Sequence, residues 1–163
     1  MEQEKEKNEE TFVKKVVQTA LEAERQIRRQ QVLHNTRMLM EEYIEMKRHI
    51  ESAVSEEEEL KEEQYDVFRG EGAHLGSVRR SKMKTAMMIA NIDRAMEELR
   101  AEYETKEMIY KYDAFKMHYI DGVSYEEIAD IQYCGKNTPS RWSKELIRKM
   151  SVKLFGIDGV EKY

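Results

Sequence analysis

Apolar residues recur every three or four positions along most of this chain, which is the spacing of amphipathic helices. A first set in residues 9–30 comprises Val13, Val16, Ala20, Ala23 and Ile27. A second set, in a shifted phase, comprises Val32, Thr36, Leu39, Tyr43, Met46, Ile50 and Ala53. The change of phase near Gln30–Gln31 predicts either a stutter in one long helix or a break near His34–Asn35.

The second set forms a narrow seam, the Val32–Ala53 seam, flanked by Glu, Lys and Arg. Narrow seams with charged flanks are typical of two-stranded or hairpin helix contacts. Two interpretations stay open: a self-association helix that makes a homo-oligomer, with a dimer as the first expectation, or a surface helix packed on its own domain.

The middle of the chain contains the clearest break in helical pattern. An acidic run, SEEEELKEEQ, covers residues 55–64 and is interpreted as a solvated helix end. RGEGAHLGS follows, and its glycines predict a linker. We place a Gly-rich and basic linker at 67–80, between an acidic helical region at 1–66 and a second domain at 81–156. The cations of VRRSKMK fit either a nucleic-acid contact or a solvated helix start.

From Ser81 the helical pattern returns, with apolar positions at Met88, Ile92, Met96, Leu99 and Tyr103. A further helix is predicted over 107–120, and Asp121–Gly122 ends it, because glycine accepts the left-handed conformation of helix ends. Ser124 and Glu127 have the spacing of a capping box, which predicts the start of a short helix.

The only proline, Pro139, is interpreted as the start of a third helix. Asn137 or Thr138 is expected to cap this helix with Pro139 in its first position, where the missing N–H costs nothing. Gly156 is expected to end it, and 157–163 is left as a tail. Trp142 is predicted to lock this helix onto the core.

Composition agrees with an all-α fold and narrows the function classes. Charged residues make up 37% of the chain, and there is one proline and one cysteine. No apolar run is long enough to span a membrane, and the charged N-terminus does not resemble a signal peptide. We therefore expect a cytoplasmic protein without a membrane partner. Cysteine and histidine spacing suggests no metal, and no cofactor or enzyme motif is found.

Charge is distributed unevenly. The net charge is −5, yet residues 136–153 contain six basic residues and a single acid, Glu145. A short helix, a turn and a basic helix are the parts of a helix-turn-helix, whose second helix enters the major groove of double-stranded DNA. The expected DNA-binding residues are Lys136, Asn137, Thr138, Ser140, Arg141, Lys144, Arg148 and Lys149.

The segment YDAFKMHYIDGVSYEEIADIQYCGKNTPSRWSKELIRKMSVKLFG resembles the C-terminal region of ArpU/RinA-type phage transcription regulators, itself similar to region 4 of bacterial sigma factors. The resemblance covers roughly residues 85–156 and rests on His118–Tyr119, Ser124 to Ala129, and Thr138 with Arg141–Trp142. It implies control of late phage or prophage genes in a bacterial host, with RNA polymerase as a further partner to consider. Gln132–Tyr133 replaces the usual leucine-glycine of the turn, and Pro139 replaces an aliphatic residue.

Two other functions remain as alternatives. A phage small terminase subunit also combines a helix-turn-helix with long helices and recognises DNA for packaging. A helical interaction protein that does not bind DNA is the second alternative.

Overall fold

The computed structural model describes residues 2–52 and 72–156, with side chains at 11–52 and 78–156. Every described element is a helix: the predicted all-α fold is confirmed. The elements are α1 (Glu2–Glu41), a helical stretch over 43–52, α3 (Gly72–Thr105), α4 (Ile109–Tyr119), α5 (Tyr125–Ile131) and α6 (Thr138–Phe155). In the part of the chain that the structure describes, no helix is both long and apolar enough to cross a membrane.

The long N-terminal helix continues through His34–Asn35. The prediction of a stutter in one long helix is therefore confirmed, and the alternative prediction of a break is wrong. The chain bends at Glu42, where helical hydrogen bonding nevertheless persists. The Glu42 amide donates to the Met38 carbonyl and the Met46 amide donates to the Glu42 carbonyl, each at 2.9 Å.

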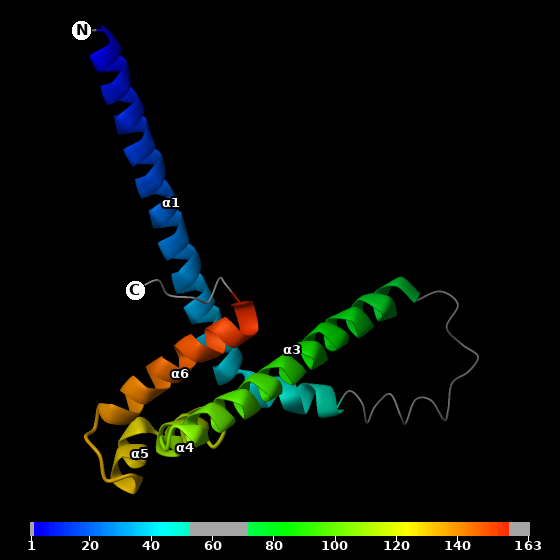
Figure 1. Cartoon of the computed structure of the whole chain (residues 1–163). Coiled ribbons are helices and arrows are strands. Elements are labelled where there is room, and N and C mark those ends of the chain that lie inside the picture. The colour runs from blue at the N-terminus through cyan, green and yellow to red at the C-terminus, as the bar shows by residue number, and fades with distance from the viewer. Residues whose placement is uncertain (1, 53–71, 157–163) are drawn as a thin grey trace.

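The phase change near Gln30 has a simple physical cause. Figure 1 shows the first part of α1 projecting away from the other helices, while its end lies against them. Described side chains before Arg29 are exposed, whereas Val32, Thr36 and Met40 are buried. The two apolar sets therefore serve different surfaces, and only the second faces the rest of the chain.

The core lies where the end of α1, α3, α4 and α6 meet, and α6 contacts each of the other four labelled helices. Tyr43 belongs to this core, and its hydroxyl donates a hydrogen bond to Asp93 of α3. The fully buried large apolar side chains of the core are Met40, Ile92, Leu99, Tyr103, Phe115, Leu146 and Met150.

This packing agrees with the second interpretation of the Val32–Ala53 seam, a helix packed on its own domain. Val32, Met40 and Tyr43 are each less than a tenth exposed because they are covered within the chain itself. Ala53 lies outside the described residues. Residues from both predicted regions, 1–66 and 81–156, contribute to this one core.

The second part of the segment predicted as a linker at 67–80 is helical. Residues 72–80 form the first turns of α3, which begins at Gly72 and not at Ser81. A glycine costs a helix only about 1 kcal/mol relative to alanine, which neighbouring turns can offset. Residues 67–71, the acidic run at 55–64 and the tail at 157–163 lie outside the described residues.

The turn from α3 to α4 fixes how the C-terminal helices start. Glu107 has a φ of 57°, and the Met108 amide donates to the Tyr103 carbonyl at 2.8 Å. The helix predicted from residue 107 therefore begins at Ile109. At its other end Gly122 has a φ of 71°, as the predicted helix stop requires.

Candidate nucleic-acid interface

The helices α4, α5 and α6 follow one another in the chain order that the helix-turn-helix prediction expects, with a short turn between α5 and α6. The capping box at the start of α5 is confirmed: the Ser124 hydroxyl accepts from the Glu127 amide, and the Glu127 carboxylate accepts from the Ser124 amide at 3.0 Å. Ile128 and Ala129 bury the inner face of α5. The small side chain of Ala129 allows the backbones of α5 and α6 to approach closely.

The turn between α5 and α6 is left-handed at Tyr133, whose φ is 51°. The Cys134 amide donates to the Ala129 carbonyl at 2.9 Å, which closes the end of α5. The Gln132 side-chain amide donates to the Tyr110 carbonyl at 3.0 Å and ties the turn to α4. Tyr133 thus adopts a left-handed conformation that glycine accepts most readily, and its side chain is 97% exposed.

The start of α6 differs slightly from the prediction. Asn137 is the N-cap without a side-chain capping bond, Thr138 is the first helical residue and Pro139 the second. Pro139 is fully buried in the structure. A proline is compatible with this first turn because the first N–H groups of a helix have no intrahelical partner.

Trp142 does not occupy the centre of the core. Its ring is half-buried and packs edge-on against Tyr110 of α4, with ring centroids 5.1 Å apart. Tyr110 is itself 43% exposed. Leu146, Ile147 and Met150 hold α6 in place instead.

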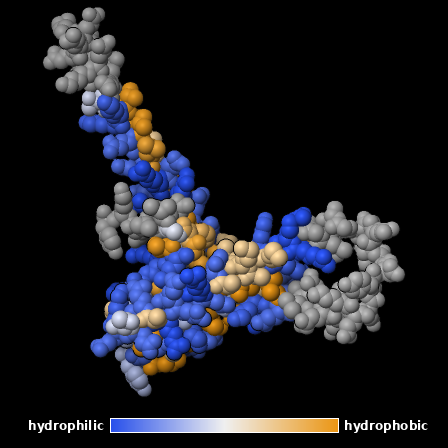
Figure 2. All heavy atoms as spheres, turned by 45° about the vertical axis from the view of Figure 1, so that its right-hand side comes forward, coloured by the Kyte–Doolittle hydropathy of each residue, from blue (hydrophilic) through white to orange (hydrophobic). Residues whose placement is uncertain are grey.

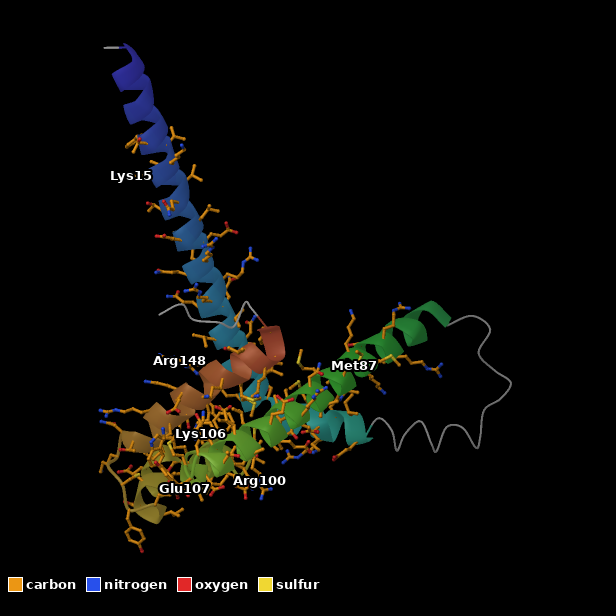
Figure 3. All side chains as sticks on the ribbon, viewed as in Figure 1. Lys15, Met87, Arg100, Lys106, Glu107 and Arg148 are labelled. Atoms are coloured by element: carbon orange, nitrogen blue, oxygen red, sulfur yellow. The ribbon has the colours of Figure 1, made fainter. Side chains whose placement is uncertain are left out.

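Three of the predicted DNA-binding cations share the outer face of α6. Arg141, Lys144 and Arg148 are all exposed, and their spacing of three and four residues places them along one side of the helix. Figure 3 labels Arg148 on the side of α6 that faces away from α3. This set is called the α6 outer face below.

Lys149 does not join the α6 outer face. Its ammonium group forms an ion pair with Glu102 of α3 at 2.5 Å and lies over the Tyr103 ring. Lys153, one turn later, pairs with Glu98 of α3 at 2.9 Å. These two lysines therefore attach α6 to α3, and the phosphate-binding role expected of Lys149 has no support in this geometry.

The other predicted residues lie around the start of α6. Asn137 is exposed, while Thr138 and Ser140 are half-buried. Lys136 is exposed and pairs with Glu126 of α5 at 2.7 Å, and this bond lowers the pKa of Glu126. The hydrogen bonds from Ser124 lower the pKa of Glu127. Three exposed acids, Glu126, Glu127 and Asp130, lie on α5, whereas α6 has exposed cations, so α6 is the surface better suited to a polyanion.

The acid of α6 is directed away from the α6 outer face. Glu145 accepts hydrogen bonds from the Tyr103 hydroxyl at 2.7 Å and from Lys111 at 2.9 Å. Burial alone would raise the pKa of Glu145, but the bonds from Lys111 and Tyr103 outweigh it and the pKa is lowered. Its charge is therefore compensated on the inner side.

A pocket of about 220 Å³ opens beside the α6 outer face, and sequence reasoning missed it. Ser140 and Lys144 line it from α6, and Arg37 and Glu41 line it from α1. Arg37 lies more than a hundred positions before Lys144, so no local pattern in the sequence joins them. The remaining lining residues are His118, Tyr119, Tyr125 and Ile147.

No group of three or more His, Cys, Asp or Glu side chains among the described residues is arranged to hold a metal ion. No family model matches the chain, and no curated protein or solved structure does so either.

Proposed function

We propose that the chain is a sequence-specific DNA-binding regulator of transcription that acts on late phage or prophage genes in the cytoplasm of a bacterial host. The observation that carries the proposal is the α6 outer face. It presents Arg141, Lys144 and Arg148 on the second helix of a helix-turn-helix, while Glu145 is turned toward α3 and α4.

The proposed mode of binding places the first turns of α6 in the major groove. The N-terminal side chains of a recognition helix meet base edges there. Arg141 and Lys144 suit the O6 and N7 acceptors of guanine, and Asn137 suits the edge of adenine. The Ser140 hydroxyl can form a hydrogen bond with several different bases. Arg148 lies about two turns beyond Arg141 and is assigned to backbone phosphates.

The local charge explains how a protein of net charge −5 can bind DNA. The lysines that pair with α3 neutralise Glu98 and Glu102 beside α6, so these carboxylates repel DNA less. Arg141 and Lys144 of the α6 outer face are exposed and form no ion pair within the described residues, so their positive charge faces solvent. A cationic patch of this kind attracts phosphates even on an anionic protein.

We also propose that the protein binds DNA as a dimer joined through the projecting part of α1. Figure 2 shows apolar side chains running along this part of the helix. Val13, Val16 and Ile27 are each more than half exposed, and with Ala20 and Ala23 they repeat at the alternating spacing of a coiled-coil seam. Two copies would then present two recognition helices to a pair of half-sites.

RNA polymerase stays a proposed partner on the strength of the resemblance to sigma region 4. The terminase and interaction-protein alternatives gain no specific observation from the geometry of the site.

The experiment that tests the proposal is selection of bound duplexes from a random pool with the full chain. Enrichment of one sequence, with a repeat that matches two half-sites, is expected. Recovery of random sequence would contradict sequence-specific regulation. Absence of any salt-dependent binding would favour the interaction-protein alternative.

A further inference from the structure

The pocket beside the α6 outer face gathers basic side chains from three different helices. Arg37 comes from α1, His118 from α4 and Lys144 from α6. Neither Arg37 nor Lys144 forms an ion pair within the described part of the chain. Glu41 is the single acid of the lining, one turn after Arg37. Arg37 and Lys144 against Glu41 give the lining a net positive charge without any contribution from His118.

Neutral hydrogen-bonding groups complete the lining. Ser140 and Tyr125 contribute hydroxyl groups from α6 and α5. Burial, followed by the effect of Tyr125, raises the pKa of Tyr119. Tyr119 therefore remains a neutral phenol at any physiological pH. The lining therefore offers both charged and neutral hydrogen-bond donors, and bonds from a charged donor to an oxyanion are the stronger ones.

The aromatic wall of the pocket is fixed in position. The His118 ring stacks on Tyr125 with centroids 3.7 Å apart and packs edge-on against Tyr119 at 4.8 Å. His118 Nδ1 lies 3.0 Å from the Val123 carbonyl oxygen. Because a carbonyl only accepts hydrogen bonds, Nδ1 carries the proton of that bond and Nε2 is the nitrogen left for a ligand.

We propose that this pocket binds a phosphate group through Arg37 and Lys144, with the Tyr125 hydroxyl as a further donor; Lys144 then contacts this phosphate in place of a guanine, and Arg141 remains the base-recognising cation of α6. Guanidinium groups match the geometry of phosphate oxygens and bind two of them at once. The phosphate comes either from the DNA backbone flanking the major-groove site or from a free phosphate compound. If the phosphate belongs to the DNA backbone, the inference rests on the proposed function.

Arg37 is the residue that separates this proposal from base recognition, because it belongs to α1 and not to the recognition helix. Arg37→Gln removes its charge and keeps much of its length. Arg100→Gln is the matched control: Arg100 is an exposed arginine of α3 that does not line the pocket (Figure 3). Helicity measured by circular dichroism checks that both variants fold.

The first arm of the experiment uses inorganic phosphate and the full chain. The melting temperature is compared in phosphate and in chloride at equal ionic strength. A rise in phosphate that Arg37→Gln loses and Arg100→Gln keeps supports a site for free phosphate.

The second arm uses a selected duplex and a scrambled duplex at several salt concentrations. For a DNA phosphate, Arg37→Gln is expected to weaken both duplexes by the same factor and to lower the salt slope by about 1. Arg100→Gln is expected to leave both affinities unchanged.

The proposal is overturned if folded Arg37→Gln matches the wild-type protein in both arms. That result leaves the proposed function standing wherever Arg141→Ala still weakens DNA binding. Conversely, a protein that does not bind DNA but keeps an Arg37-dependent phosphate effect would contradict the proposed function and support the pocket.

Discussion

The hydroxyl of Tyr103 in α3 donates a 2.7 Å hydrogen bond to the carboxylate of Glu145 in α6. Lys111 of α4 donates to the other oxygen of the same carboxylate at 2.9 Å. One acidic side chain thus connects three helices, and its orientation keeps negative charge away from the α6 outer face. Burial, followed by the bond to Glu145, raises the pKa of Tyr103, so the phenol remains a donor.

Glu145→Gln is expected to destabilise the fold by about 1 kcal/mol at pH 7, since the side chain is partly exposed and solvent screens the ion pair. The lowered pKa of Glu145 means that this contribution is complete above the ordinary value of 4.5. It is lost as the pH falls through the lower folded value. Urea unfolding at pH 7 and at successively lower pH values measures the difference.

Glu104→Gln is the matched control for Glu145→Gln, because Glu104 is an exposed acidic residue near the end of α3. It should leave stability nearly unchanged at every pH. The ion pair would not be the source of the stabilisation if the difference in unfolding free energy between wild type and Glu145→Gln stayed constant down to pH 3.

Leu146→Ala is expected to cost more stability than Trp142→Ala, although tryptophan is the larger residue. Leu146 is fully buried, and its truncation should cost about 2–5 kcal/mol. Trp142 is half-buried against an exposed tyrosine, and we expect a loss of about 1–2 kcal/mol. Urea unfolding followed by circular dichroism compares the two. The reverse order would place Trp142 in the core after all.

Tyr133→Gly is expected to stabilise the protein by up to about 1 kcal/mol. A left-handed backbone costs a non-glycine residue about 1–2 kcal/mol, partly offset by the greater freedom of glycine in the unfolded chain. The Tyr133 side chain is almost wholly exposed, so little packing is lost. Asp130→Gly, an exposed position within α5, should destabilise instead. A lower melting temperature for Tyr133→Gly would indicate that the tyrosine makes a contact of its own.

Local chemistry made the C-terminal helices predictable from the sequence. The capping box of Ser124 and Glu127 and the left-handed Gly122 each depend on a few neighbouring residues, and the structure confirms both. The end of α6 at Phe155, before Gly156, follows in the same way.

Packing between distant residues was not predictable in this way. The apolar spacing from Val32 onward indicated a helical contact, but spacing does not identify the partner, which proved to be the chain itself. Lys149 was grouped with Arg148 because the two are adjacent. One residue turns a helix by about 100°, which takes Lys149 toward Glu102.

Val16→Glu combined with Ile27→Glu is expected to shift the light-scattering mass from dimer to monomer, because it places charge in the exposed seam of α1. Met87→Glu is the matched control, since Met87 is an equally exposed apolar residue of α3 (Figure 3). The α1 dimer would be contradicted if the wild-type protein had the mass of a monomer. It would also be contradicted if Met87→Glu lowered the mass and the α1 double variant did not. A ring of eight or more copies would favour the packaging alternative.

The central claim is that the first turns of α6 recognise bases while Arg148 holds the backbone. The most direct test is the affinity of wild type, Arg141→Ala, Arg148→Ala and Lys149→Ala for selected and scrambled duplexes across a series of salt concentrations. Arg141→Ala should cost about 1–3 kcal/mol on the selected duplex and relax discrimination at one base pair. Arg148→Ala should weaken both duplexes equally and lower the salt slope by about 1. Lys149→Ala should leave the slope unchanged, because its charge is already paired with Glu102. Equal weakening of both duplexes by Arg141→Ala would contradict base recognition by α6, and unchanged affinity in all three variants would show that α6 is not the DNA surface.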